Sequence, residues 1–568
     1  MDYSIKIGGE AGQGIQTIGH VLAKVLTRGG SHVFVNQDYE SRIRGGHNIY
    51  QLRFSDRRIL SPSKKVDIIV AFDKASIEEH GDELTENGMV LYDSETLGKK
   101  YNNPLFLDVP MQALAVEKGG NKVMMNTAAA GAVLGMLGHE FSILEAIIKS
   151  SFSKKGSGII EGNINAGKSG YEYTRGKCHK CNFSISPVKS KKMMLMNGNE
   201  ALALGALAAG CKFASAYPMT PATGVITYLA GKAGDFDLVV EQAEDEIAAI
   251  NMAIGASYAG VRALTATSGG GFCLMTEGLS LAGMTETPLV IVLAQRPGPA
   301  TGLPTRTEQA ELLFALNAGH GEFPRVIMSP GTAEEAFYSI QKAFNIAEKY
   351  QTTVIVMSDQ HLADSYWSIE SLDPRRIKVD RAMINDDEIT DDYKRHKITD
   401  SGVSPRAIPG QAGKAVVVTD SDEHDEDGHI IEDSSTRNAM VEKRMRKLKG
   451  ISSGILKPEL YGKNDPELLL IGWGSTYGAL KEAVDTLNSH GKHISMLHFM
   501  ELWPFPEGIA ETVRSAKKSF TVENNNTGQL RRLIRMETGV ECSGSITKYD
   551  GRPLTPEDII KEVENADN

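Results

Sequence analysis

"YPMTPAT", residues 217–223, follows a strand-like run at 212–217 and precedes a helical pattern, and the rest of the fold can be worked out from this turn. Its two prolines bracket Thr220; each proline fixes its own φ at about −65° and disfavours helical geometry in the residue before it. Tyr217 and Thr220 therefore have little conformational choice. One interpretation is that Thr220 caps a helix whose first residue is Pro221. The other is that the turn holds a hydroxyl for a ligand.

Strand-like and helical patterns alternate on the C-terminal side of this turn. Strand-like runs lie at 236–240, 262–267, 288–295, 325–328 and 352–357, each separated from the next by a helical segment. This alternation is typical of a doubly wound α/β domain with a parallel sheet. Because ligands of such sheets bind outside the carboxyl ends of the strands, these ends are where we look for a site.

Four strand ends carry unusual residues. They are Thr220, an acidic cluster that begins at Glu241, "TSGGG" at 267–271, and Arg296. "TSGGG" offers backbone donors without side-chain bulk, which suits the close approach of a ligand. Arg296 ends the apolar run "PLVIVLAQ" and precedes a proline-rich loop, and a guanidinium there can grip a carboxylate with two hydrogen bonds. We expect the four ends to converge on one site.

The segment "EQAEDEIAAINMAIGA", residues 241–256, places one acid on an apolar helix face. Glu244 and Asp245 suit the first turn of a helix through its dipole. Glu246 is expected one turn into the helix, at helical spacing from Ala249, Ile250, Ala253 and Ile254. A carboxyl on that face is desolvated and can share a proton with a ligand nitrogen. The alternative is that Glu246 is a third acid that complements the dipole.

Thr220, Glu246 and Arg296 together describe a pocket for a small carboxylate beside a heterocycle. "YPMTPAT", "EQAEDEIAAINMAIGASYAG", "TATSGGGFCLMTEG" and "QRPGPATGLPTRTEQAELL" resemble, in this order, the alpha subunits of the 2-oxoacid:ferredoxin oxidoreductases, with the gamma domain fused in front. The resemblance covers essentially the whole chain. It implies an α/β fold of three α/β domains, in which the middle one is a doubly wound thiamine-diphosphate-binding (pyrimidine) domain.

The resemblance also implies domain limits and site residues. The gamma domain spans 1–175, a linker with the CxxC motif 176–196, the pyrimidine-type domain 197–450 with a charged excursion at 370–450, and a transketolase C-terminal-like domain 451–568. Thr220 and Arg296 would hold the substrate carboxylate, and Glu246 would hydrogen-bond the aminopyrimidine of thiamine diphosphate. The positions implied in cofactor binding are Tyr217, Pro218, Glu246, Thr267, Ser268, Gly269, Gly12, Gln13 and Gly14.

The implied reaction is the coenzyme A-dependent oxidative decarboxylation of a 2-oxoacid to acyl-CoA and CO2, with electrons passed to ferredoxin. 2-Oxoglutarate is the first candidate, and pyruvate and branched-chain oxoacids stay open. The family's magnesium-diphosphate motif and a four-cysteine cluster set are absent from this sequence. The resemblance therefore implies a separate beta subunit that carries Mg²⁺ and a [4Fe–4S] cluster, shares the thiamine diphosphate, and forms a dimer of gamma-alpha/beta heterodimers. This chain should be inactive alone.

The opening segment supports a rival function. "GGEAGQGIQT" after a strand resembles a dinucleotide fingerprint, which would indicate a nicotinamide- or flavin-dependent oxidoreductase, but Thr17 stands where the third glycine is expected. The family resemblance suggests instead that this loop handles coenzyme A, with its amides at a helix N-terminus and with Arg42 and Arg44 as candidate anion ligands. A noncatalytic scaffold subunit is the third possibility.

Composition limits the classes of function that remain open. A net charge of −11 over 568 residues argues against nucleic-acid binding, and with no apolar run near 18 residues and no signal-peptide pattern we expect a cytoplasmic protein without a membrane span. "CHKC", Cys178 to Cys181 with His179 between them, is half a metal site or a pair of linker thiols. The acidic stretch 420–435 is expected to be solvated, with His424 and His429 as candidate cation ligands.

Overall fold

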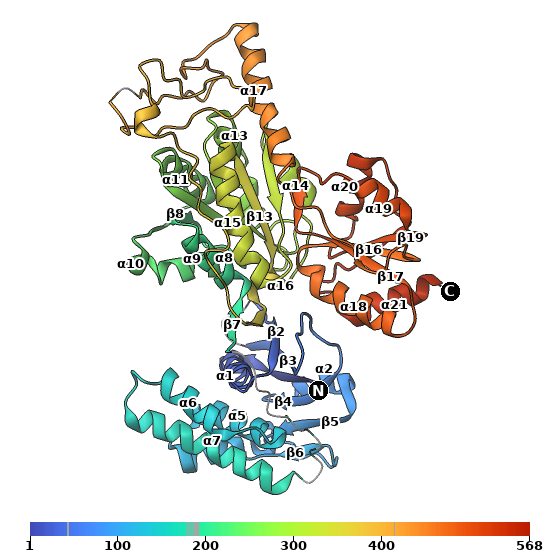
Figure 1. Ribbon diagram of the computed structural model, residues 1–568. Coiled ribbons are helices and arrows are strands. Elements are labelled where there is room, and N and C mark those ends of the chain that lie inside the picture. Colours follow the sequence, from blue (N-terminus) through green and yellow to red (C-terminus); the bar gives the residue numbers. More distant parts are fainter. Residues whose placement is uncertain are drawn as a thin grey trace. The chain divides into compact units, whose positions relative to one another are not determined.

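The computed structural model describes residues 1–41, 45–178, 181, 183, 185, 192–413 and 415–567. They form two compact units (Figure 1). Unit 1 comprises residues 1–196, 365–371 and 555–557, and unit 2 comprises 197–364, 372–554 and 558–568. Three mixed or parallel sheets with flanking helices make up the chain, which confirms the predicted α/β class.

Unit 1 is built on an eight-stranded mixed sheet in the order β6-β5-β4-β1-β3-β2-β14-β7. Its strands are β1 (Asp2–Ala11), β2 (His32–Asp38), β3 (Gly45–Ser55), β4 (Val66–Ala71), β5 (Leu84–Tyr92), β6 (Phe106–Asp108), β7 (Met194–Asn197) and β14 (Tyr366–Ile369). Its helices are α1 (Ile15–Arg28), α2 (Ala75–His80), α3 (Ser94–Leu97), α4 (Met111–Leu114), α5 (Met125–Leu137), α6 (Phe141–Ser151) and α7 (Ser157–Lys177).

The pairing of β1 decides against the dinucleotide fingerprint. β1 pairs in parallel with β4 and antiparallel with β3, whereas β2, the strand after α1, pairs antiparallel with β3. A dinucleotide-binding unit needs β1 and the strand after its helix side by side and parallel. The glycine loop therefore opens a strand–loop–helix unit of a different topology, and the rival prediction is wrong on this point.

The larger sheet of unit 2 has the order β18-β12-β13-β11-β10-β8-β9, and all its pairs are parallel except that of β18 with β12. Its strands are β8 (Cys211–Ala216), β9 (Val239–Gln242), β10 (Arg262–Thr267), β11 (Leu289–Gln295), β12 (Arg325–Met328), β13 (Thr353–Asp359) and β18 (Glu501–Trp503). The helices of this part are α8 (Gly198–Ala208), α9 (Thr223–Ala230), α10 (Ala233–Phe236), α11 (Glu246–Tyr258), α12 (Gly269–Leu274), α13 (Thr276–Met284), α14 (Leu312–Asn317), α15 (Ala333–Tyr350), α16 (Gln360–Asp364) and α17 (Ser434–Ser452). Every residue of β10, β11 and β13 is buried, as expected for a sheet covered on both faces.

The second sheet of unit 2 has the order β15-β17-β16-β19-β20. Its elements are β15 (Tyr461–Gly462), β16 (Leu468–Trp473), β17 (Ile494–Phe499), β19 (Lys518–Glu523), β20 (Gly544–Thr547), α18 (Tyr477–Ser489), α19 (Ile509–Ser515), α20 (Gln529–Thr538) and α21 (Pro556–Asp567). One apolar cluster runs continuously from the strands of the larger sheet to β16 and β17. The two sheets of unit 2 therefore share a core.

The charged excursion at 370–450 is only partly solvated. Lys443 and Lys447 of α17 are fully buried and form ion pairs with the carboxylate of Glu286, and Nδ1 of His396 lies 3.2 Å from the same carboxylate. His424 is buried beside His396, with ring centroids 4.1 Å apart. His429, by contrast, is exposed. The two candidate cation ligands, His424 and His429, therefore lie in different environments, and cation binding by them stays a prediction.

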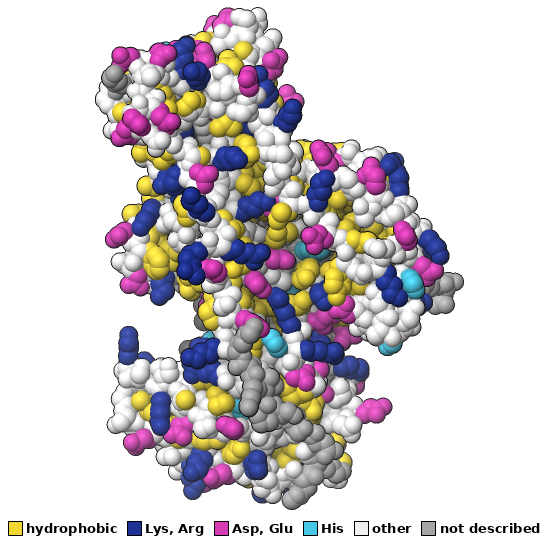
Figure 2. Space-filling model, viewed as in Figure 1, with side chains coloured by type: hydrophobic (Ala, Val, Ile, Leu, Met, Phe, Trp, Pro, Cys, Tyr) yellow, Lys and Arg dark blue, Asp and Glu magenta, His cyan; other side chains and the backbone are white. Residues whose placement is uncertain are grey.

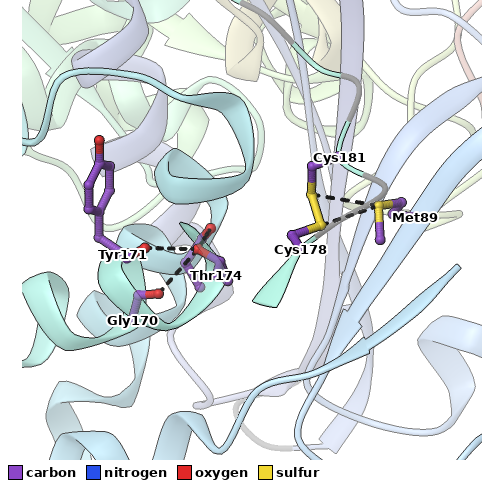
Figure 3. The surroundings of a disulfide bond; sticks show 7 residues. Met89, Gly170, Tyr171, Thr174, Cys178 and Cys181 are labelled. Carbon is purple, nitrogen blue, oxygen red and sulfur yellow. Dashed lines mark hydrogen bonds between the residues drawn. A yellow bond between two sulfur atoms is a disulfide. The ribbon is translucent and has the colours of Figure 1, made fainter. Parts of the chain in front are cut away.

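Cys178 and Cys181 form a disulfide at the end of α7 (Figure 3). Their Sγ atoms lie 3.8 and 3.7 Å from Sδ of Met89 on β5. Neither half a metal site nor a pair of free thiols describes this arrangement, because each sulfur is bonded to the other. His179 lies outside the described residues.

On the face drawn in Figure 2, Lys and Arg side chains are interspersed with Asp and Glu. No helix among the described residues has the length and apolar character needed to cross a membrane.

Candidate functional site

The predicted site residues follow four neighbouring strands of the larger sheet of unit 2. β8 lies between β9, the next strand in sequence, and β10, the strand after that. The connection after β8 runs to β9 on one side, and the connection after β10 runs to β11 on the other, which makes the carboxyl ends of β8 and β10 a topological switch point. Open α/β sheets bind their ligands at such points.

Arg296 and Thr220 meet at this edge of the sheet. Arg296 follows β11, and its Nη1 donates a 2.7 Å hydrogen bond to the backbone carbonyl of Thr220. The helix after the turn begins at Thr223 with Ala222 as its N-cap residue, and the Thr220–Pro221 peptide is cis. The interpretation of Thr220 as the helix cap is therefore wrong, because a turn of residues 220–222 separates it from the helix. Tyr217 and Pro218 are exposed.

Glu246 is the first residue of α11, and Asp245 caps this helix by accepting a 2.6 Å hydrogen bond from the Ala248 amide. The predicted position one turn into the helix is wrong, because the chain before Asp245 is not helical. The burial follows the predicted face: Glu246 is only 3% exposed, and the other buried positions include Ala249, Ile250, Ala253 and Ile254.

One carboxyl oxygen of Glu246 is buried without a partner. Among the described residues, nothing forms a hydrogen bond with its Oε1. Leaving a buried acceptor unsatisfied costs about 1–3 kcal/mol, so such an atom calls for an explanation. A ligand that supplies a hydrogen-bond partner would provide one.

The end of β10 and the start of α12 are shaped around this carboxyl. A Cβ atom on Gly271 would lie 2.5 Å from Oε1 of Glu246 and 2.1 Å from Oγ1 of Thr267, so only glycine leaves room there. Oγ1 of Thr267 lies 4.0 Å from Sδ of Met219 in the turn after β8. Thr267 and Ser268 are fully buried, and the hydroxyl of Ser268, like Oε1 of Glu246, lacks a partner among the described residues. The structure therefore brings Glu246, Thr267 and the turn after β8 together.

Glu311 is a second acid at this edge; the residue is half-buried with its Oε2 fully buried, and it was not predicted from the sequence. A Cβ atom on Gly269 would lie 2.4 Å from Oε1 of Glu311. The Glu311 amide donates a 3.1 Å hydrogen bond to Oε1 of Gln295 at the end of β11. Burial, reinforced by the nearby Glu308 carboxyl, raises the pKa of Glu311 to about 8, although the Arg296 guanidinium opposes the shift. Burial also lowers the pKa of the Arg296 guanidinium.

At neutral pH the pocket edge thus holds a protonated acid beside a guanidinium. Glu311 precedes a short helix in an irregular segment, where periodicity gives no signal. The only available clue was an acid directly before the apolar run "LLFAL".

The glycine loop of unit 1 is held by contacts within that unit. Gly12 and Gly14 have φ of 96° and 77°, and a Cβ atom on Gly14 would lie 2.0 Å from Nδ2 of Asn126. Oε1 of Gln13 accepts a 2.8 Å hydrogen bond from the Glu10 amide. The close approach of Asn126 thus explains why residue 14 is a glycine, and a ligand is not needed to explain it. The predicted anion ligands Arg42 and Arg44 lie outside the described residues.

Comparison with protein families defines the class of protein. Residues 204–443 match the thiamine-diphosphate-binding family "Pyruvate flavodoxin/ferredoxin oxidoreductase, thiamine diP-bdg". Residues 4–173 match "Pyruvate ferredoxin/flavodoxin oxidoreductase", and residues 466–559 match "Pyruvate:ferredoxin oxidoreductase core domain II". The chain thus has the α/β parts of a thiamine-diphosphate-dependent oxidoreductase.

Full-length relatives narrow the class to one family. The chain is 34% identical to a 2-oxoacid:ferredoxin oxidoreductase subunit alpha of Sulfolobus sp, over 98% of this chain and 96% of the relative. It is 31% identical to the 2-oxoglutarate oxidoreductase subunit KorA of Mycobacterium tuberculosis, over 99% of this chain and 91% of the relative. A structure of the 2-oxoglutarate:ferredoxin oxidoreductase of Magnetococcus marinus, with 2-oxoglutarate, coenzyme A and succinyl-CoA bound, superposes with a TM-score of 0.93 at 32% identity and covers 99% of both chains. The chain belongs to the 2-oxoacid:ferredoxin oxidoreductases and is an alpha subunit of that family.

Proposed function

We propose that this subunit takes part in the coenzyme A-dependent oxidative decarboxylation of a 2-oxoacid, with 2-oxoglutarate as the first candidate and ferredoxin as the electron acceptor. The KorA relative and the Magnetococcus marinus enzyme, both named for 2-oxoglutarate, support this choice of substrate. Pyruvate and branched-chain 2-oxoacids are the alternatives. The observation that carries the proposal is the buried, unpartnered Oε1 of Glu246 at the switch point of the sheet.

The residues at this point fit the ring of thiamine diphosphate. The unsatisfied carboxyl oxygen of Glu246 provides a hydrogen-bonding partner for a planar heterocycle, and Gly271 leaves room for this carboxyl beside Oγ1 of Thr267. When bound, thiamine diphosphate supplies the carbon nucleophile and electron sink for decarboxylation. The carboxyl of Glu246 holds and moves a proton at the ring nitrogen, and its helix keeps it away from water.

Arg296 and Thr220 would hold the carboxylate of the 2-oxoacid. The hydrogen bond from Nη1 to the Thr220 carbonyl restricts the Arg296 guanidinium and leaves its other N–H groups for a substrate. A guanidinium held in this way can form two hydrogen bonds to a carboxylate. We propose Tyr217, Pro218, Thr267, Ser268 and Gly269 as the surrounding cofactor contacts.

We further propose a beta subunit that supplies Mg²⁺, the diphosphate site and a [4Fe–4S] cluster, in a dimer of heterodimers. Residues 12–14 would contact coenzyme A. The domain limits proposed are 1–175 for the gamma domain, 176–196 for the linker, 197–450 for the pyrimidine-type domain and 451–568 for the C-terminal domain. A cytoplasmic location remains a prediction.

The test replaces Glu246 in the complex reassembled with its beta subunit. Because general acid–base groups contribute about 10²–10⁴-fold, Glu246→Gln should lower 2-oxoacid-dependent viologen reduction by this factor while the subunits still assemble. Glu244→Gln, at an exposed position two residues earlier, is the matched control and should keep full turnover. Near-normal turnover of Glu246→Gln would remove the catalytic assignment.

A substrate panel on the copurified complex tests the choice of oxoacid separately. 2-Oxoglutarate, pyruvate and a branched-chain 2-oxoacid are compared by kcat/KM. A higher value for either of the last two would refute the first candidate without affecting the role of Glu246.

A further inference from the structure

Two histidines in unit 1 present the same ring nitrogen to each other. His47 lies on β3 and His80 is the last residue of α2, and their Nε2 atoms are 3.0 Å apart. Both side chains are 15% exposed, so the pair is largely shielded from water yet reachable. The function proposed above uses neither residue.

Carboxylates stand behind both rings. Nδ1 of His80 lies 2.7 Å from Oε1 of Glu83, and because a carboxylate only accepts, His80 donates this hydrogen bond. Nζ of Lys6 lies 3.4 Å from the same nitrogen and forms an ion pair with Glu83. Because the contact of Nδ1 with Glu83 is shorter than that with Lys6, the proton on Nδ1 of His80 points to Glu83. Nδ1 of His47 faces Oδ2 of Asp73 at 3.6 Å. In the tautomer with a proton on each Nδ1, the two Nε2 atoms direct lone pairs at each other; in the other tautomer of His47, its Nε2 donates a hydrogen bond to Nε2 of His80.

Two lone pairs facing each other at 3.0 Å repel unless a cation or a shared proton lies between them. A third ligand is close: Oε2 of Glu79 is 4.0 Å from Nε2 of His47, and the ligand atoms of His47, Glu79 and His80 all lie within 4.8 Å of one another. Asp73, Glu79 and Glu83 together carry three negative charges and Lys6 one positive charge. The local charge balance therefore favours a bound cation.

The distances suit a transition metal after small movements. Zn–N bonds of about 2.0–2.1 Å in a tetrahedral site place two nitrogens about 3.3 Å apart, so the pair needs to open by a few tenths of an ångström. The side chain of Glu79 is 58% exposed and can swing toward the nitrogens. A carboxylate hydrogen-bonded to the far nitrogen of a ligating histidine is the usual outer-shell arrangement of metal sites. It occurs here at His80 with Glu83, while Asp73 lies 3.6 Å from the far nitrogen of His47.

We propose that His47, His80 and Glu79 bind one divalent transition-metal ion, with Zn²⁺ as the best match to two imidazoles and one carboxylate. Glu83 and Asp73 orient the two rings. The three protein ligands leave a fourth position for water or a small ligand. Among the described residues, a second histidine–carboxylate cluster, at Glu286, His396 and His424, lacks this capacity because Lys443 and Lys447 already neutralise its carboxylate.

The test uses the full-length chain, stripped with a chelator and kept free of reductant so that the disulfide between Cys178 and Cys181 persists. The exposed thiol of Cys273 is alkylated beforehand, because it could also bind metal. Co²⁺ is titrated and the d–d absorption of tetrahedral Co²⁺ is recorded, after which Zn²⁺ is added as a competitor. We expect one equivalent of Co²⁺ to bind and Zn²⁺ to displace it.

Variants assign the ligands. His47→Ala and His80→Ala should abolish the tetrahedral Co²⁺ signal, and Glu83→Gln should weaken binding by about 10–100-fold, the usual effect of losing an outer-shell partner. His490→Ala, at an exposed histidine in unit 2, should bind like the parent. Circular dichroism of the metal-free variants shows whether they fold. Absence of binding by the parent, or equal binding by the folded His47→Ala and His80→Ala variants, would overturn the proposal and leave a proton shared by the two rings.

Discussion

The three glycines after Thr267 differ in what their missing side chains would meet, and this difference gives a sharp prediction. A Cβ atom on Gly271 would lie 2.5 Å from Oε1 of Glu246, whereas the nearest atom to a Cβ on Gly270 would be the Ala300 carbonyl oxygen at 4.0 Å. Both glycines lie in the first turn of α12 without a positive φ, so alanine fits the backbone at each. Gly271→Ala and Gly270→Ala therefore form a matched pair that differs in side-chain contact.

The expected magnitudes follow from these distances. Ordinary van der Waals contact begins at about 3.5 Å. Gly271→Ala must therefore displace Oγ1 of Thr267, which would lie 2.1 Å from the new Cβ, and the Glu246 carboxyl, at 2.5 Å, by about 1 Å or more. A misplacement of this size can cost about 10²-fold in rate, and overpacking costs about 1–3 kcal/mol of stability. Gly270→Ala instead gains about 0.5–1 kcal/mol, because alanine loses less backbone entropy in a helix than glycine does.

The assay measures 2-oxoacid-dependent viologen reduction and thermal unfolding for both variants in the reassembled complex. We expect Gly271→Ala to lose about 10²-fold in turnover with a slightly lower Tm, and Gly270→Ala to keep its turnover with an equal or higher Tm. Parent-like turnover of Gly271→Ala would refute the placement of Glu246 in the cofactor pocket. So would an equal loss in Gly270→Ala, because the effect would then belong to the loop as a whole.

Three further predictions concern charged groups. Arg296→Lys should raise the KM for the 2-oxoacid by about tenfold or more, because an ammonium cannot reproduce the two hydrogen bonds of a guanidinium; an unchanged KM would place the carboxylate elsewhere. Burial raises the pKa of Glu311 from its ordinary value of 4.5 to about 8, so its stabilising contribution is complete below pH 4.5 and is lost as the pH rises through 8. Glu311→Gln should therefore flatten the fall of Tm between pH 4.5 and 8, and an unaltered pH profile would contradict the shift. Glu286→Gln should destabilise unit 2 by about 3–5 kcal/mol, since it leaves Lys443 and Lys447 buried without a counter-charge, and a parent-like Tm would contradict this ion pairing.

The strands of the middle domain could be predicted closely from the sequence. Those at 262–267 and 325–328 have the predicted bounds, and the others differ by one to three residues at one or both ends. Long apolar runs between turn residues are a local signal, and parallel strands buried on both faces produce it strongly. The buried face of the helix that carries Glu246 is likewise encoded in local periodicity.

Features that depend on distant contacts could not be predicted. β3 was not predicted, because it begins at Gly45 and Gly46, both with positive φ, and continues with alternating polar residues. Glu311 draws its character from burial beside residues of other segments. The start of α11 was misplaced because only the side-chain contact of Asp245 shows where the helix begins.

β14 has a practical consequence for anyone who wishes to isolate the front part of the chain. This strand, residues 366–369, follows α16 of unit 2 in the sequence but belongs to the sheet of unit 1. There it pairs with β2 and lies between β2 and β7. A fragment that ends at residue 196 would omit β14 and leave the backbone groups of β2 on that side unpaired. Open strand edges of this kind invite association with other chains, so such a fragment should self-associate unless a peptide spanning 365–371 is supplied.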